Sequence, residues 1–437
     1  MSVRSVAMMV SVSMVVPLGG AIAQAVDPIA PLPAPGLTVP TPLPVPPTTP
    51  AVVPPAIVLP PPLWQADDAV QLLAAIRASA KEGLNPADYD PAGLDAALRS
   101  NNSVALSAAA TDRFNKLASD YALGHVRREA RVDWHVSDPD LSTTSRRALL
   151  DQALASQGIA AALAGLLPSH PQYGALRYAL DITPATETAK VNRIRLNMDR
   201  WRWLPRDLGA KYIIVNVPSF HATLVENGVT RWKHKAIAGA IKTPTPQLNA
   251  MATGVILNPW WEVPTSISKE VAGKGGFVPV KGKDGKVQRW RQPPGPTNAL
   301  GQLKFVMQNP YAIYLHDTNA RSRFNSSVRA LSHGCIRTEK VLDLAGELLG
   351  DDNGEWTQEK IQAALDSKTA TQANFVKPLP VYIVYFSSAA LVDGKIQDYE
   401  DVYKRDARTI TALLNRDGKG PAVAKPAAAP GKKVTAR

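Results

Sequence analysis

One short segment of the chain gathers the residue types that acyl transfer requires: Ser332, His333, Gly334, Cys335, Ile336 and Arg337. A thiolate is the reactive nucleophile, and a nearby cation such as Arg337 lowers the pKa of its thiol. Gly334 permits a tight turn and lets a substrate carbonyl approach backbone amides, which can donate hydrogen bonds to an oxyanion. The segment therefore predicts an activated nucleophile at Cys335.

A histidine lies upstream, in the segment Tyr314-Leu315-His316-Asp317. The apolar run 312–316 predicts a strand, and a histidine at the end of a strand presents a base at the rim of a sheet. A nucleophile and a base are the minimum set for acyl transfer. We therefore expect His316 to act as the general base for Cys335.

The spacing of these two sites is a further signal, because fifteen residues, 317–331, separate His316 from Ser332. A histidine, a spacer of this length, Ser/Thr-His-Gly-Cys, an apolar residue and then Arg or Asn is the pattern of the L,D-transpeptidases, and this sequence resembles it at every position. The surrounding segments look like the scaffold-bearing branch of that family found in Gram-negative periplasms: Gln292-Pro293-Pro294-Gly295-Pro296, Asn298-Ala299-Leu300-Gly301 and Tyr314-Leu315-His316-Asp317-Thr318. The resemblance covers residues 64–410 and is strongest over 192–340.

The resemblance implies an α+β chain, in which an N-terminal all-α scaffold domain precedes a mostly β, YkuD-like catalytic domain. It implies Cys335 as the nucleophile and His316 as the base, with the imidazole oriented by a backbone carbonyl near Asp317. The residues that it implies in lining the site or positioning substrate are His333, Ser332, Gly334, Arg337 and Tyr314.

The activity that the resemblance implies is that of a peptidoglycan L,D-transpeptidase. The thiolate would attack the amide between the L-centre of a diamino acid and the terminal D-Ala of a tetrapeptide stem, leaving a thioester. The amine of a second stem would then resolve the thioester and form a 3-3 cross-link. None of these steps requires a cofactor or a metal, and carbapenems are expected to acylate such a thiolate.

The sequence departs from the larger relatives in two places. Those relatives usually carry a peptidoglycan-binding module between scaffold and catalytic domain, whereas residues 181–192 here pass directly from one to the other. The lid-like loop expected over residues 264–296 is also shorter. Both departures bear on substrate preference rather than on the chemistry.

Several other functions remain open at this point. Water, a free D-amino acid or an envelope protein could replace the second stem, which would give an L,D-carboxypeptidase, an exchange enzyme or a protein-attaching enzyme. A zinc site could use His316, His333 and Cys335, and a non-catalytic protein could simply bind the cell wall. A papain-like protease requires a histidine after the cysteine, and none follows Cys335.

The rest of the chain predicts the elements that position these residues. Residues 1–25 carry Arg4, an apolar run and small residues ending at Ala25, which indicates a secretory signal and a periplasmic location; an uncleaved membrane anchor is the alternative. Proline-rich residues 26–63 predict an extended linker. A helical scaffold domain is expected over 64–190, the catalytic domain over 191–410, and a basic disordered tail over 411–437.

Periodicity refines this division. Apolar residues recur at helical spacing over 114–121, 145–155, 159–167 and 174–182. Strands are expected over 212–217, 220–225, 229–238, 254–257, 304–307, 312–316 and 381–386, with turns at Asn227-Gly228 and Asp393-Gly394. Residues 273–296 predict a mobile loop over the ligand face. A helix is expected over 338–349, with Thr338 as its N-cap, and its N-terminus would lower the pKa of Cys335.

Composition excludes few classes of protein. The net charge of +12 would suit a polyanion, but five of the positive charges lie in the Ala/Pro/Gly-rich tail after Asp417, so we do not expect nucleic-acid binding. An exported chain with Cys335 as its single cysteine has no internal disulfide. The reactive surroundings of Cys335 favour catalysis over a structural role.

Overall fold

The computed structural model describes residues 61–137, 141–351, 354–391 and 395–420. The predicted signal segment, most of the linker and the turn at Asp393-Gly394 lie outside these residues. Among the described helices, none combines the length and the apolar character needed to cross a membrane.

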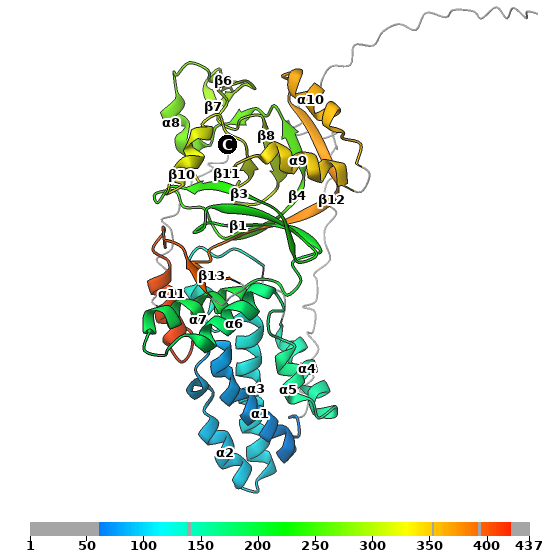
Figure 1. Cartoon of the computed structure of the whole chain (residues 1–437), viewed down its shortest axis with the longest axis vertical. Helices are drawn as coiled ribbons and strands as arrows, with labels where there is room; N and C mark the ends of the chain where they lie inside the picture. The colour runs from blue at the N-terminus through cyan, green and yellow to red at the C-terminus, as the bar shows by residue number, and fades with distance from the viewer. Residues whose placement is uncertain (1–60, 138–140, 352–353, 392–394, 421–437) are drawn as a thin grey trace, which may run out of the picture. The chain divides into compact units, whose positions relative to one another are not determined.

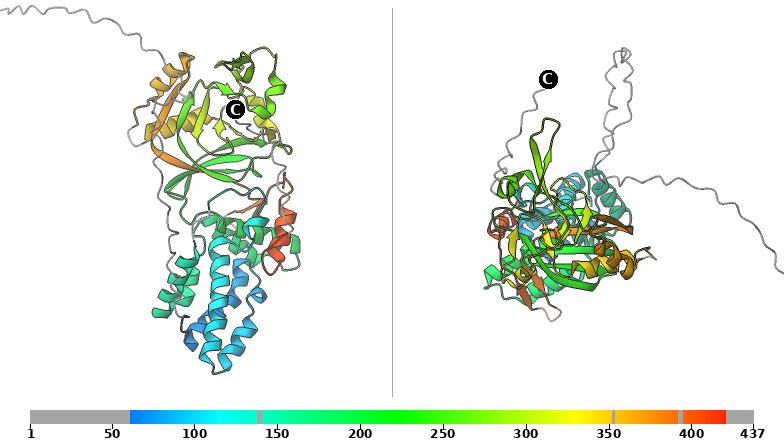
Figure 2. Two further views of the ribbon diagram at one scale, coloured as in Figure 1. Left: turned by 180° about the vertical axis from the view of Figure 1, so that it is seen from behind. Right: turned by 90° about the horizontal axis from the view of Figure 1, so that it is seen from above.

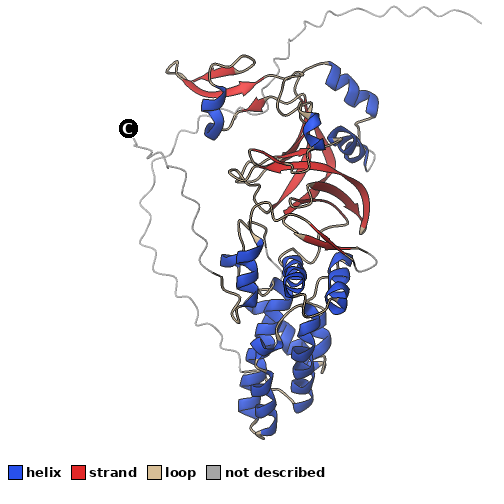
Figure 3. Ribbon diagram, turned by 60° about the vertical axis from the view of Figure 1, so that its left-hand side comes forward, coloured by secondary structure: helices blue, strands red, loops and turns tan. Residues whose placement is uncertain are grey.

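The first part of the chain is helical, as Figure 3 shows by colour. Its helices are α1 Ala66–Ala78, α2 Pro91–Arg99, α3 Ser103–Leu123, α4 Thr143–Ala155, α5 Ile159–Ala164, α6 Pro171–Ile182 and α7 Thr188–Arg202. Asp90 and Asn102 cap α2 and α3 with side-chain oxygens that accept backbone N–H groups, and Pro91 occupies the first turn of α2. The four helices predicted from periodicity are confirmed, although α5 ends earlier than expected.

A hydrophobic core holds the first five helices together. Trp64 packs on Phe114 with ring centroids 6.2 Å apart, and Leu72, Leu117 and Leu150 are fully buried beside them. Only residues 183–187 connect α6 to α7. The structure therefore agrees with the prediction that no further module is inserted at residues 181–192.

The second part of the chain is built on one closed β-sheet (Figures 1 and 2). Its strands are β1 Lys211–Asn216, β2 His221–Glu226, β3 Val229–Gly239, β4 Leu248–Leu257, β8 Leu303–Met307, β9 Leu315–His316, β10 Ala330–Ser332, β11 Ile336–Thr338 and β12 Thr371–Val384. They lie in the order β10-β3-β11-β9-β8-β4-β12-β1-β2, and a further pairing of β2 with β3 closes the sheet. The sheet is mixed, because β1–β12, β3–β10 and β9–β11 are parallel pairs.

The turn predicted at Asn227-Gly228 joins β2 to β3. Both residues have positive φ, 50° and 77°, which is the backbone that a tight hairpin requires. The predicted strand over 312–316 is much shorter in the structure, since only Leu315 and His316 pair as β9.

The expected loop over 273–296 is wrong, because much of it is a β-hairpin. Strands β5 Trp261–Glu262, β6 Val278–Lys281 and β7 Val287–Gln292 form a separate three-stranded sheet beside the short helix α8 Ser268–Val271. Gly285 turns the hairpin with φ 74°, and Figure 3 shows the hairpin extending away from the main sheet. Val263, Ile267 and Val271 give this sheet a small core of its own.

The remaining elements follow the nucleophile segment. They are α9 Val341–Gly350, α10 Gln358–Asp366, β13 Ser388–Ala390, β14 Ile396–Asp398 and α11 Asp406–Leu414. The helix predicted from Thr338 begins three residues later, at Val341, and Thr338 ends β11. The N-cap of α9 is Lys340, which has a left-handed backbone conformation and makes no side-chain capping hydrogen bond.

The predicted boundaries at 190 and 410 need correction. A single core joins α6, α7 and α11 to β1 and β12, with Trp201, Phe386 and Leu413 among its members, so α7 belongs to both parts. Residues 411–420 are ordered as well: the Arg127 amide donates to the Gly418 carbonyl at 3.0 Å, and His125 contacts the Asn415 carbonyl at 2.8 Å. The rest of the predicted tail, residues 421–437, lies outside the described residues.

Candidate active site

Cys335 lies in the short connection between strands β10 and β11, both of which pair with β3. It follows β10 Ala330–Ser332 and directly precedes β11, so in the described chain, contrary to the prediction, no helix begins directly after it; α9 starts only at Val341. Gly334 has φ 119°, a backbone that only glycine adopts readily, and an added Cβ would lie 3.2 Å from Ile313. The glycine therefore shapes the turn that presents the thiol.

The hydroxyl of Ser332 ties this turn together. It donates to the Cys335 carbonyl at 2.6 Å and accepts from the Gly334 amide at 3.1 Å. Ser332 is 3% exposed, and both of its hydrogen bonds lie within the turn, so its observed part is to hold the turn, and its predicted contact with substrate stays a prediction. The Gly334 amide is also already bonded, and it does not point freely to an oxyanion.

Thr245 anchors the same turn from the loop before β4. Its buried hydroxyl donates to the Gly334 carbonyl at 2.7 Å and accepts from the Gly239 amide at 2.8 Å. The Thr245 hydroxyl thus links Gly334, the residue before Cys335, to Gly239 at the end of β3. Nothing in the sequence near the cysteine signals this threonine, which the sequence analysis missed.

His316 lies on β9, the strand next to β11. The parallel register places Leu315 opposite Ile336 and His316 opposite Arg337. Burial, and then the positive charge of Arg337, lower the pKa of His316 to about 3, while the Asp317 backbone acts the other way. The ring is therefore neutral at neutral pH. Within the described residues its Nδ1 has no hydrogen bond of ordinary geometry, but a backbone hydrogen bond with Asp317, where the orienting carbonyl was expected, acts on the ring.

Polar groups surround the sulfur of Cys335. Burial raises the pKa of this thiol, and hydrogen bonds from Tyr314 and the charges of Lys304 and Arg337 offset only part of that effect. The expected lowering of the Cys335 pKa is therefore wrong, because burial outweighs the groups that lower it. Burial and the neighbouring sulfur also raise the pKa of Tyr314 well above its usual value, so its hydroxyl remains a hydrogen-bond donor.

Lys304 is a member of the site that the sequence analysis missed. It pairs with His316 across β8 and β9, and its ammonium lies 5.5 Å from the centre of the Tyr314 ring. Burial lowers the pKa of Lys304, whereas Glu262 and Cys335 raise it. The sequence did hold a signal for Lys304, because it stands within the apolar run of β8, and a lysine that is buried there needs a polar or charged partner.

The other predicted residues divide into two groups. Arg337 and Tyr314 are half-buried beside the thiol, as a substrate-positioning role requires. His333 is the exposed member: its side chain is 52% exposed, and its Nε2 lies 3.8 Å from Glu270 of α8. Three or more His, Cys, Asp or Glu residues do not gather anywhere in the described chain as metal ligands would.

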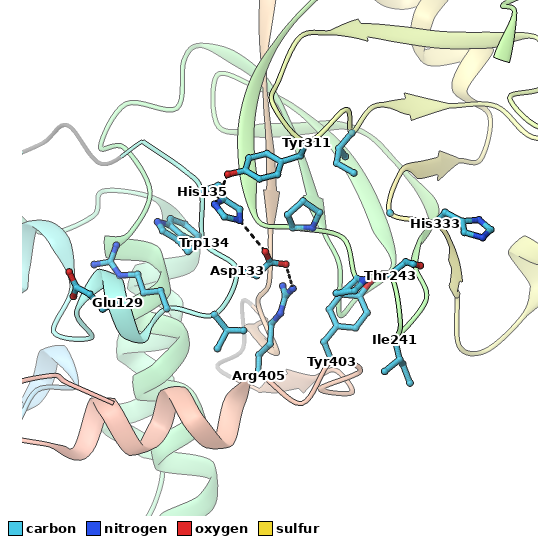
Figure 4. Close-up of a pocket in the computed structure, with 16 residues that line it drawn as sticks. Glu129, Asp133, Trp134, His135, Ile241, Thr243, Tyr311, His333, Tyr403 and Arg405 are labelled. Carbon is cyan, nitrogen blue, oxygen red and sulfur yellow. Dashed lines mark hydrogen bonds and ion pairs between the residues drawn. The ribbon is translucent and has the colours of Figure 1, made fainter. Parts of the chain in front are cut away.

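A cavity of about 690 Å³ lies beside the nucleophile turn (Figure 4). Its walls come from residues 129–135 after α3, from Ile241, Thr243, Pro244 and Pro246, and from Tyr311 and Ile313. Tyr403 and Arg405 complete it, and His333 and Gly334 form its edge near Cys335. The helical part of the chain therefore lines a cavity whose edge is Gly334, the residue before Cys335.

Comparison with known proteins agrees with this architecture. Residues 210–376 match the L,D-transpeptidase catalytic domain of the YkuD family, and residues 60–180 match a scaffold domain. The chain therefore carries a YkuD-type L,D-transpeptidase catalytic domain preceded by a scaffold domain. This arrangement confirms the predicted α+β class.

One curated relative and several solved structures are similar to parts of this chain. A Haemophilus influenzae protein named "Putative L,D-transpeptidase" is 29% identical over 262 residues, or 54% of this chain, and the chain spans only about half (52%) of that relative. A mutant L,D-transpeptidase of Enterococcus faecium is 11% identical, with 42% of this chain and 52% of that chain covered and a TM-score of 0.23. An L,D-transpeptidase in complex with imipenem is 15% identical, with 40% and 59% covered and a TM-score of 0.20. With TM-scores this low, the assignment rests on the two domain matches.

Proposed function

We propose that this chain is a peptidoglycan L,D-transpeptidase that forms 3-3 cross-links through a thioester on Cys335. The observation that carries the proposal is the pairing of β9 with β11, because it sets His316 beside the strand that begins immediately after Cys335. A half-buried thiol, a neutral imidazole and a tyrosine donor are the groups that acyl transfer uses.

In the first half-reaction the thiol and the base both begin uncharged. The Cys335 proton passes to His316 as the S–C bond forms to the carbonyl of the third stem residue. The Tyr314 hydroxyl and the Lys304 ammonium are close enough to the sulfur to stabilise the oxyanion that develops. The C–N bond then breaks, and the proton on His316 leaves with the amine of D-Ala.

In the second half-reaction an amine of another stem attacks the thioester. The new C–N bond forms as the S–C bond breaks, and the proton released by the amine returns through His316 to the sulfur. Water or a D-amino acid in place of that amine would give hydrolysis or exchange at the same site. An envelope protein bearing a suitable amine is a further acceptor of the same chemical class.

We also propose a periplasmic location and inhibition by carbapenems. The location follows from the signal-like residues 1–25 and from the peptidoglycan substrate. A carbapenem offers a strained carbonyl to the same thiol, so the expected product is a covalent adduct on Cys335.

Product analysis of the full chain tests the proposed function. Wild type and Cys335→Ala are incubated with disaccharide-tetrapeptide, and the products are separated and weighed. Loss of D-Ala with formation of a dimer in wild type alone supports transpeptidation. Tripeptide without dimer would reassign the activity to a carboxypeptidase, and no turnover would contradict the proposal in favour of a wall-binding protein.

A further inference from the structure

The cavity beside the nucleophile turn has one wall from the scaffold part of the chain, and that wall is fixed. Trp134 forms a β-bridge with Gln247. The His135 amide donates to the Gln247 carbonyl at 2.8 Å, and the Gln247 amide donates to the Asp133 carbonyl at 3.0 Å. Residues 133–135 are therefore attached to the entry of β4, next to the loop that bears Thr243 and Thr245.

The charges at the floor of this cavity are paired with one another. Asp133 lies 2.7 Å from Arg405 and 3.0 Å from the Nε2 of His135, as the dashed lines in Figure 4 show. Arg405 also packs over Tyr403 at 4.9 Å from the ring centre. Because these charges already satisfy each other, this floor does not select a bare ion.

Besides the exposed side chains of Glu129 and His333, the groups left for a ligand are an aromatic pair and an apolar wall. Tyr311 and His135 pack with ring centroids 4.3 Å apart and ring planes tilted by 30°, and the Tyr311 oxygen lies 2.8 Å from the Nδ1 of His135. Tyr311 is 43% exposed, and Ile241 across the cavity is 70% exposed. Aromatic and aliphatic walls with a few hydrogen-bonding groups fit a peptide with amide groups and small apolar side chains.

The cavity and the thiol surroundings suit different halves of the reaction. The donor stem carries a free D-Ala carboxylate next to its scissile amide, and the cations Lys304 and Arg337 act on Cys335. Neither cation lines the cavity, whose edge at Gly334 directly precedes Cys335. The donor end therefore fits the cationic surroundings of the thiol, and the cavity is left for the second substrate.

We propose that this cavity holds the acyl acceptor, the peptide of a second stem, between the scaffold wall at His135 and the catalytic-domain residues Tyr311 and Ile241. The inference rests on the proposed function, and it makes the scaffold domain a determinant of acceptor specificity. Tyr311 and His135 bind the acceptor peptide, and Asp133 and Arg405 hold His135 in place.

Two-substrate kinetics on the full chain test this inference. Disaccharide-tetrapeptide is the donor, and disaccharide-tripeptide, which lacks the terminal D-Ala, serves only as acceptor. Ile241→Trp fills the cavity from an exposed position, and Tyr311→Ala removes the aromatic wall. Each is expected to raise the acceptor KM about tenfold relative to the donor KM, the scale on which buried aromatic contacts contribute to binding. Tyr311→Phe keeps the ring and should give an intermediate increase.

The control is Tyr178→Ala on α6, which removes an exposed tyrosine that does not line the cavity. Its two KM values should equal those of wild type, and thermal melts of all variants establish that they fold. If wild type is active and both cavity variants keep its ratio of acceptor KM to donor KM, the inference is overturned. The proposed function is unaffected by that result.

Wild type without any product would overturn the proposed function instead. In that case calorimetric titration of disaccharide-tripeptide into wild type and Ile241→Trp decides on the cavity alone. Weaker binding to Ile241→Trp supports a peptide site, whereas equal binding to both proteins, or none to wild type, overturns it.

Discussion

Arg337 on β11 lies opposite His316 on β9, so a guanidinium borders the buried imidazole that is proposed as the base. Burial first, and Arg337 second, lower the pKa of His316 to about 3, and burial raises the pKa of Cys335. The resting site thus holds a neutral thiol and a neutral imidazole, rather than a thiolate–imidazolium pair. The imidazole is consequently unprotonated at neutral pH, the state that a base must have before it accepts a proton.

Replacing Arg337 with Gln should raise the pKa of His316. The substitution removes a positive charge that disfavours the imidazolium, but burial remains, so the new pKa should lie between about 3 and the usual 6.5. NMR titration of the His316 ring measures it. Arg231→Gln removes an exposed arginine on β3 that pairs with Glu226, and it should leave the titration unchanged. An unshifted His316 in Arg337→Gln would contradict the electrostatic role of Arg337.

The alkylation rate of Cys335 should increase on the alkaline side of neutrality. Because burial raises the thiol pKa, the rate with iodoacetamide should have its midpoint above the usual value of about 8.5. Lys304→Met removes a cation that favours the thiolate, so its midpoint should be higher still. Lys286→Met, in the exposed β6–β7 hairpin, is the matched control. A midpoint near neutral pH in wild type would show that the free enzyme holds an ion pair.

Thr245→Val should destabilise the protein by about 2 kcal/mol, because it leaves a buried backbone donor and a buried acceptor without partners. The two groups are the Gly239 amide and the Gly334 carbonyl. Urea unfolding measures the loss of unfolding free energy, and Thr245→Ser should retain most of the stability. Equal stability of the valine and serine variants would show that the hydroxyl does not hold the nucleophile turn.

The free energy of unfolding should decline as the pH falls from 6.5 to 4, in part through His170. Burial lowers the pKa of His170 to about 4, so in this window the unfolded chain binds a proton that the folded chain does not, and acid favours unfolding. His170→Asn keeps an acceptor at the N-cap of α6, where the His170 ring accepts from the Gln172 amide at 3.1 Å, and removes the titration. Its stability should change less over this window, by about 1–3 kcal/mol. Equal pH dependence in both proteins would contradict the buried neutral state of His170.

Local patterns in the sequence predicted much of the fold. Helical periodicity predicted α3, α4 and α6. Asn227-Gly228 predicted the β2–β3 hairpin, because the positive φ angles of a tight turn depend on these two residues alone. The hairpin β6–β7 was missed although Asp284-Gly285 is a turn signal of the same kind. The abundance of Gly, Pro and Lys around it favoured a loop, and packing of Val263, Ile267 and Val271 was not visible in the pattern.

The candidate site was predictable only where its residues are close in sequence. The segment around Cys335 and its spacing from His316 identified the two groups proposed for catalysis. The bonds of the Ser332 hydroxyl to the Cys335 carbonyl and the Gly334 amide could not be predicted, because they depend on the turn geometry. The attachment of His135 to Gln247 joins residues more than a hundred positions apart. No local signal could show that the scaffold lines the cavity.

The most direct test of the account is to trap the acyl-enzyme. The full chain is mixed with disaccharide-tetrapeptide, quenched in acid, digested and mapped by mass spectrometry. The account predicts that the peptide containing Cys335 gains the mass of the donor minus D-Ala as a hydroxylamine-sensitive thioester, and that Cys335→Ala gains nothing. Release of D-Ala with no modified Cys335 peptide, or the same turnover in Cys335→Ala, would contradict it.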